Sequence, residues 1–156
     1  YGSLLHISME SELCEICSKE PYSHSFKLLN TEYVYIYYTN IANAKKYNDV
    51  NGIISHYNLY LSKLPCDKKW VYIVDCHELS AKHLVCFEVA MTLCKLINDK
   101  YNQSLIKIVI LNPNMYIHMI YNMIWAFLTK EMADKVIYDY NFNTLNYWVN
   151  YNYDSN

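Results

Sequence analysis

Two cysteines near the amino terminus have the spacing of a metal-binding or redox motif. Cys14 and Cys17 enclose two residues in the stretch CEIC, which would supply half of a structural zinc site. No second CxxC pair is present, so His6 and His24 would have to complete the four ligands. A thioredoxin-like motif is disfavoured, because that motif follows a strand and none precedes it here. We therefore predict two cysteines on a half-buried helix and no metal site.

The six cysteines as a set do not require a disulfide framework. The chain has 156 residues, of which 53% are hydrophobic, so one domain can bury a sizeable core without covalent links. The first seventeen residues lack the basic start and apolar stretch of a signal peptide and carry three glutamates instead. We therefore predict free thiols and a cytoplasmic protein.

A second group of polar side chains follows the predicted strand KWVYIVDC. Asp75, His77 and Glu78 come just past its carboxyl end, where sites in α/β proteins tend to lie. Catalysis would also need a nucleophile or a metal partner, and the sequence has no GxSxG or HExxH motif. The two glycines, Gly2 and Gly52, are too few for a Gly-rich phosphate loop. We therefore predict no enzymatic activity, with Asp75 capping the next turn.

Charge and hydropathy exclude two classes of partner or location. The formal net charge is −2, from 13 basic and 15 acidic residues, and no basic patch suggests nucleic-acid binding. The longest run without a formal charge is 108–129. Its helical part, 115–128, would be roughly 21 Å long at about 1.5 Å per residue. A bilayer core is about 30 Å thick, so we predict no membrane span.

Apolar periodicity predicts strands that alternate with helices. The predicted strands are 31–40, 69–76, 104–112 and 134–140, and the predicted helices are 81–101 and 114–128, with further helix in 1–30 and 51–64. Strands separated by helix-length segments indicate βαβ crossovers and a parallel sheet. Ser80 is the expected cap of the 81–101 helix.

The 114–128 helix has an unusual distribution of polar residues. Asn114, His118 and Asn122 are spaced four apart and form one narrow polar stripe, while the rest of the circumference is apolar. The preceding Asn112-Pro113 pair ends a strand and suits a first helical turn. Such a helix is either buried on all sides or covers something apolar that is not part of the chain.

The order of these motifs resembles Sec14-like, or CRAL-TRIO, lipid-binding domains. It reads YIVDCHELS, then LINDKYNQSLIKIVILNP, IWAFL and DKVIYDY, between Glu32 and Tyr140. The resemblance implies an α/β fold with a mixed, mainly parallel sheet of about four to five strands, helices packed on it, and one helix acting as a pocket lid. It divides the chain into an N-terminal helical segment, 1–30, a CRAL-TRIO-like domain, 31–150, and a polar tail, 151–156.

The resemblance places a ligand pocket beneath the 114–128 helix. The lid residues expected to face the ligand are Tyr116, Ile120, Met123 and Phe127, which lie opposite the polar stripe. Val74 and Ile110, on neighbouring strands, are expected to line the same pocket.

Two further positions correspond to the headgroup site of phosphatidylinositol-binding members. Those members have Tyr-Pro-Glu before the third strand and Lys before the fourth. Here the first place reads Tyr101, Asn102, Gln103, and Lys135 stands in the second. The carboxylate is lost, but Lys135, with Gln103, is expected at the polar end of a bound lipid.

The resemblance implies a non-catalytic lipid-binding or lipid-transfer domain. Its ligand would be a phospholipid or another hydrophobic small molecule, with no cofactor other than this lipid. Loading and release would involve transient, peripheral contact with a membrane surface. The short form also looks like divergent modules that act through protein partners, so a protein-interaction scaffold with a reduced or empty pocket is the alternative.

Overall fold

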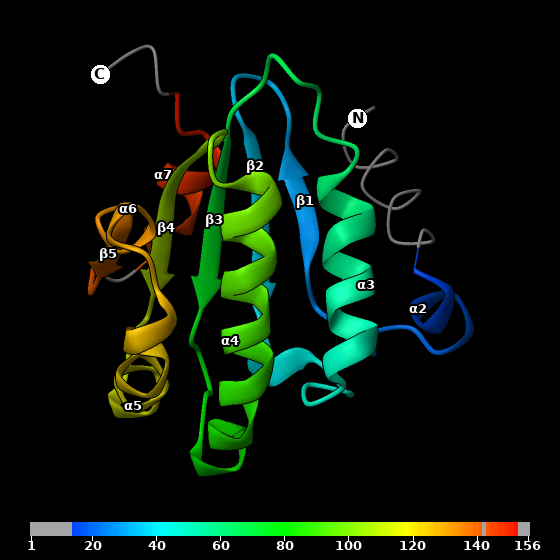
Figure 1. The fold of residues 1–156 in the computed structure, drawn as a ribbon, viewed down its shortest axis with the longest axis vertical. Coiled ribbons are helices and arrows are strands. Elements are labelled where there is room, and N and C mark those ends of the chain that lie inside the picture. Colours follow the sequence, from blue (N-terminus) through cyan, green and yellow to red (C-terminus); the bar gives the residue numbers. More distant parts are fainter. Residues whose placement is uncertain (1–13, 142, 153–156) are drawn as a thin grey trace.

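Five strands form one mixed sheet in a computed structural model that describes residues 14–141 and 143–152 (Figure 1). The strands are β1 (Lys27–Asn30), β2 (Tyr35–Asn40), β3 (Trp70–Asp75), β4 (Leu105–Leu111) and β5 (Val136–Asp139), in the spatial order of the chain. β1 pairs antiparallel with β2, and the remaining neighbours are parallel. The predicted α/β class, with its mixed, mainly parallel sheet, is confirmed.

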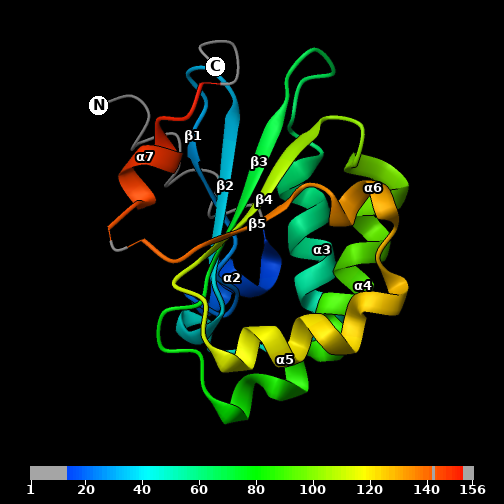
Figure 2. The same cartoon turned by 90° about the vertical axis from the view of Figure 1, so that its left-hand side faces the viewer.

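The crossover helices lie together on one face of the sheet. The chain contains α2 (Glu15–Lys19), η1 (Ile41–Asn43), α3 (Val50–Leu61), η2 (Ala81–Cys86), α4 (Phe87–Leu96), the π-helical turn η3 (Ile97–Tyr101), α5 (Met115–Ile124), η4 (Trp125–Phe127), α6 (Lys130–Ala133) and α7 (Leu145–Val149). Right-handed crossovers between successive neighbouring strands bring their helices to the same side. Figure 2 shows α3, α4 and α5 on that side and α7 on the opposite one.

The central strand β3 is buried along its whole length, and its side chains alternate between two cores. Tyr72 and Val74 belong to the larger core, beneath the helices. Val71 and Ile73 belong to a smaller core, which Trp148 of α7 helps to cover. The helix-covered face therefore holds the greater part of the apolar side chains and is where a pocket can form.

Side-chain caps fix where the helices begin. Asn114 accepts hydrogen bonds from the backbone N–H groups of Tyr116 and Ile117 at the start of α5. Ser80 caps η2 through a capping box with His83, as predicted. At the start of α3, Asp49 accepts from the N–H of Gly52. These caps satisfy helix donors that would otherwise be unpaired.

The predicted boundaries at the two ends of the chain are corrected. Within 1–30, residues 27–30 form strand β1 rather than helix, and the boundary at residue 31 falls between two paired strands. In the predicted polar tail, Tyr151 is only 8% exposed and packs against Trp148. Residues 1–13 and 153–156, including His6, lie outside the described residues.

Candidate functional site

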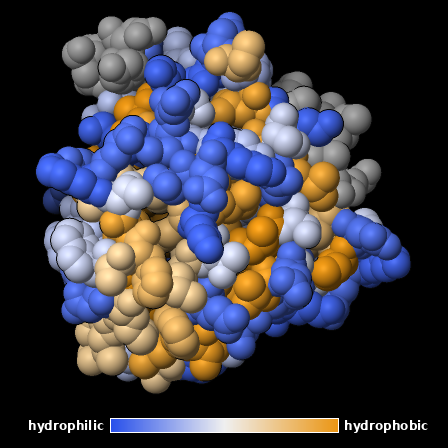
Figure 3. All heavy atoms as spheres, viewed as in Figure 1, coloured by the Kyte–Doolittle hydropathy of each residue, from blue (hydrophilic) through white to orange (hydrophobic). Residues whose placement is uncertain are grey.

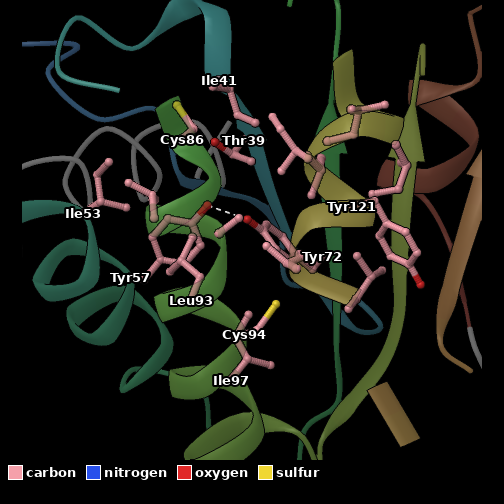
Figure 4. Close-up of a pocket in the computed structure, with 18 of the residues that line it drawn as sticks. Thr39, Ile41, Ile53, Tyr57, Tyr72, Cys86, Leu93, Cys94, Ile97 and Tyr121 are labelled. Atoms are coloured by element: carbon pink, nitrogen blue, oxygen red, sulfur yellow. Dashed lines mark hydrogen bonds between the residues drawn. The ribbon is translucent and has the colours of Figure 1, made fainter. Parts of the chain in front are cut away.

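An apolar cavity of about 140 Å³ lies between the sheet and its covering helices (Figure 4). Its floor includes Val74 of β3 and Ile108 and Ile110 of β4. Its walls come from α3, α4 and α5, with Leu93 and Ile120 among the lining side chains. The sequence placed Val74, Ile110 and Ile120 at this site, and the structure brings all three to the cavity.

Helix α5 closes the cavity with a regularly spaced face. The lining residues of this segment are Ile117, Ile120, Tyr121, Ile124 and Leu128. Their spacing of three and four residues is that of one side of a helix. These apolar side chains close one side of the cavity. Helix α5 therefore lies where the sequence placed the lid.

Three of the residues predicted for the ligand face do not line the cavity. Tyr116 is half-buried against the core beside it, whereas Met123 and Phe127 are 43% and 59% exposed on the outer surface. The inner face is rotated by roughly a quarter turn from the predicted one, at about 100° per residue. The predicted face was the side of the helix opposite the polar stripe.

Contacts of the polar stripe explain this rotation. Asn114 Nδ2 donates to the carbonyl oxygen of Leu79 at 3.0 Å. The His118 ring stacks on Tyr138 of β5, with the ring centroids 4.8 Å apart, and its Nε2 lies 3.2 Å from the Tyr140 hydroxyl. Two of the polar side chains therefore contact the protein, and the side of α5 that faces solvent is mostly apolar, with Asn122 exposed beside the methionines.

Two tyrosines place hydroxyl groups at the cavity. Tyr57 of α3 and Tyr72 of β3 point toward one another, with their hydroxyl oxygens 2.5 Å apart (Figure 4). Burial raises the pKa of Tyr57 to about 12 and that of Tyr72 well above its usual value, so both hydroxyls stay protonated at neutral pH. Ser25 and Thr39, whose hydroxyls are 2.6 Å apart, also line the cavity. The cavity is thus apolar with a small hydroxyl-bearing region.

The two predicted headgroup residues lie away from this cavity. Lys135 Nζ donates to the carbonyl and side-chain oxygens of Asn102, at 2.7 and 2.9 Å, and lies 3.9 Å from a Glu131 carboxylate oxygen. Gln103 lines a separate polar depression near Lys69. Neither is among the residues that line the apolar cavity. Lys135 instead ties β5 to the turn before β4.

The three polar residues at the carboxyl end of β3, Asp75, His77 and Glu78, do not form a catalytic cluster, and Asp75 makes hydrogen bonds to neighbouring segments. Asp75 accepts hydrogen bonds from the Tyr38 hydroxyl at 2.6 Å and from Asn112 Nδ2 at 2.9 Å. It also accepts from the N–H of His77 at 3.0 Å, which makes it the turn cap that the sequence predicted. His77 and Glu78 are exposed, with side chains 68% and 70% accessible. The carboxylate therefore fixes the strand ends.

The walls formed by α3 and α4 were not predicted as part of the site. Tyr57, Leu93 and Ile97 line the cavity, and the sequence had indicated only that the 81–101 segment is a helix packed on the sheet. Tyr57 carried no comparable local signal. Its position follows from the packing of α3 beside β2 and β3.

Two comparisons with known proteins agree with the fold. The profile of the CRAL/TRIO domain matches residues 34–150. The chain belongs to the CRAL/TRIO domain family. The crystal structure of Sfh5 matches with a TM-score of 0.64 and 10% sequence identity, over 89% of this chain and 55% of that one. A comparison with curated proteins gives no match.

Membership of the CRAL/TRIO family confirms the resemblance seen in the sequence. The family binds hydrophobic small molecules such as lipids, and its members are generally not enzymes. At this low identity, the likeness to Sfh5 shows the fold alone, and the present chain spans about half of the length of that protein. No helix in the described ranges is long and apolar enough to cross a bilayer.

Proposed function

We propose that this domain binds or transfers a phospholipid or similar hydrophobic ligand without catalysis. The observation that carries the proposal is the apolar cavity between the sheet and α3, α4 and α5. Its lining is mostly aliphatic and aromatic, and its few polar groups are hydroxyls, thiols and the His24 imidazole, which can orient a ligand. Family membership supports the same class of ligand.

The cavity volume implies that α5 moves when a lipid enters. A cavity of roughly 150 Å³ holds a molecule of the size of benzene, and pockets for larger ligands have about 300–1,000 Å³. The present cavity, at about 140 Å³, is smaller than this range, so a whole lipid needs more space than the cavity now offers. Outward displacement of α5 and η4 would enlarge the cavity and open it, because both segments lie at the surface.

The outer side of α5 supports transient docking on a membrane surface. Met115, Met119 and Met123 follow one another at a spacing of four and are 63%, 41% and 43% exposed. Trp125 and Phe127 of η4 extend this surface and are 57% and 59% exposed. Figure 3 shows apolar surface over this part of the molecule. In the cytoplasmic setting that we propose, such a face suits peripheral contact with a lipid headgroup region.

A protein-interaction scaffold is the second candidate function. The small volume of the cavity favours it, because a fold that never loads a lipid needs no larger space. The same exposed methionines and aromatics would then contact a partner protein. The two functions differ in whether lipid enters the protein.

Lipid uptake distinguishes the two functions. The full chain is incubated with phosphatidylcholine vesicles, separated from them and examined by native mass spectrometry. We expect one lipid per chain in the wild-type protein and loss of that lipid in Ala90→Phe, because Ala90 lines the cavity. Ala81→Phe is the matched control, since Ala81 is exposed. Folded wild-type protein that takes up no lipid would contradict lipid binding and favour the scaffold.

A further inference from the structure

Four side chains with metal-binding atoms meet beside helix α3. Cys14 and Cys17 come from the start and middle of α2, His24 from the segment before β1, and His56 from α3. Their sulfur and ring-nitrogen atoms all lie within 4.8 Å of one another. Residues up to 42 positions apart in the chain, Cys14 and His56, thus converge on one point.

The sulfur–nitrogen distances match the edges of a tetrahedral zinc site. Cys14 Sγ lies 3.5 Å from His24 Nδ1, and Cys17 Sγ lies 3.6 Å from His24 Nδ1 and 3.7 Å from His56 Nδ1. With Zn–S of about 2.3 Å and Zn–N of 2.0–2.1 Å, the tetrahedral S···N edge is about 3.5–3.6 Å. Two thiol protons can account for only two of these three contacts as ordinary hydrogen bonds. A shared central ion accounts for all three.

Hydrogen bonds on the far side of each imidazole select the metal-binding tautomer. His56 Nε2 lies 2.7 Å from the carbonyl oxygen of Phe26, which can only accept, so Nε2 carries a proton. His24 Nε2 lies 3.0 Å from Asp49 Oδ2 and is a donor for the same reason. In the neutral rings, both Nδ1 lone pairs therefore face the two sulfurs. Metal-bound histidines commonly have such a carboxylate or carbonyl partner.

Burial indicates a structural site rather than a catalytic one. Cys14, Cys17, His24 and His56 are 3%, 9%, 6% and 2% exposed, respectively. Four protein ligands complete a tetrahedral shell and leave no position for water or substrate. Two thiolates also balance the charge of a divalent ion, so the buried group is neutral overall.

We propose that Cys14, Cys17, His24 and His56 bind one Zn²⁺ as a structural site. On binding, the two thiols release two protons and the two neutral imidazoles donate through Nδ1. The sequence had suggested His6 as the fourth ligand and led to the expectation of no metal. His6 lies outside the described residues, and His56 fills the fourth place through packing of α3 against the Phe26 segment.

Gly52 leaves room for the Asp49 carboxylate, which contacts the proposed ligand His24. Asp49 uses one carboxylate oxygen to accept from the Gly52 N–H, at 3.2 Å, and the other to contact His24. A Cβ atom on residue 52 would collide with Asp49 Oδ2. A residue without a side chain at this position therefore lets Asp49 cap α3 and orient His24 at the same time.

The ion would join the amino-terminal segment to the cavity wall. Without it, the five-residue α2 is too short to be stable alone. The ion connects α2 and the His24 segment to α3, and His24 itself lines the cavity. The site is independent of lipid binding, because none of its four ligands needs a lipid to converge.

Metal analysis of the full chain tests the proposal. The protein is produced in zinc-supplemented medium, passed through a weak chelating resin and measured by inductively coupled plasma mass spectrometry. We expect close to one zinc per chain in the wild-type protein and in Cys66→Ser, whose thiol is exposed. Loss of zinc is expected in the double variant Cys14→Ser/Cys17→Ser. Equal zinc in the two variants would overturn the assignment.

Cobalt substitution gives a second readout on the wild-type protein, which avoids variants that fail to fold. Zinc is removed with a strong chelator under reducing conditions, and Co²⁺ is added. We expect the intense visible bands of tetrahedral cobalt and a sulfur-to-cobalt charge-transfer band, both lost on addition of one equivalent of Zn²⁺. Wild-type protein that carries no zinc and gives no such spectrum would contradict the proposal.

Discussion

The helix-covered face of the sheet has two contrasting regions. Around α3, aromatic and polar side chains form a dense set of contacts. Phe26 stacks on Tyr57 with centroids 3.7 Å apart, and His56 stacks on Tyr60 at 4.3 Å. Beneath α5, by contrast, apolar side chains surround a cavity. We expect the first region to resist displacement, because many directional contacts would break together.

On the proposed function, we expect the second region to open at lower cost. The inner face of α5 contributes non-directional apolar contacts, and the empty volume beneath it means that these contacts are incomplete. Among the described contacts, its polar interactions lie at its start and along one edge, such as Asn114 to the carbonyl of Leu79 and His118 to the Tyr140 hydroxyl. We therefore expect one face of a single sheet to carry both a fixed wall and a movable cover.

The largest effect is expected from breaking the fixed region at its centre. Phe26→Ala removes a ring that is 2% exposed and stacks on Tyr37 and Tyr57. We expect a loss of about 3–5 kcal/mol in the free energy of unfolding, as for other large-to-small core substitutions. Chemical denaturation measures it. A loss below about 1 kcal/mol would mean that the region is not tightly packed.

An intermediate effect is expected at the helix cap that borders the proposed metal site. Gly52→Ala would force the Asp49 carboxylate away from the start of α3. We expect a loss of about 1–2 kcal/mol, typical of a lost N-cap, together with weaker zinc retention. Asn51→Ala, at a neighbouring exposed position, is the control. Equal stability of the two variants would show that Asp49 has no such role.

A smaller effect is expected at Lys135. Its ammonium group donates to two oxygens of Asn102, so Lys135→Ala should lower the free energy of unfolding by about 1 kcal/mol. Lipid uptake should be unchanged, because the side chain does not line the cavity. The variant is compared with wild type by denaturation and by native mass spectrometry after vesicle incubation. Loss of lipid with unchanged stability would restore the headgroup role implied by the family resemblance.

The smallest effect on stability is expected at the outer surface of the cover. Phe127→Ala should change the free energy of unfolding by less than about 0.5 kcal/mol, because the ring is 59% exposed. It should nevertheless weaken sedimentation of the protein with phosphatidylcholine vesicles. Tyr33→Ala, at a half-exposed aromatic in the β1–β2 turn, is the control. Equal sedimentation of both variants would contradict docking through η4.

The sequence predicted the elements with strong local patterns and missed those fixed by tertiary contacts. β2 to β5 fall within the predicted strand ranges, because their aromatic and β-branched runs are typical of buried strands. β1 was missed because four residues, Lys27–Asn30, give too short a pattern. The inner face of α5 was misassigned because His118 is polar but packs on Tyr138. The proximity of His56 to Cys17 could not be predicted from local sequence patterns, because 39 positions separate the two residues.

Hydrogen–deuterium exchange tests most directly whether α5 is a movable cover over a lipid cavity. Exchange of backbone amides in α5 and α3 is followed with and without phosphatidylcholine vesicles. We expect faster exchange in α5 than in α3 without vesicles, and a change confined to α5 and η4 when vesicles are added. Equal protection of the two helices, unaffected by vesicles, would contradict this expectation.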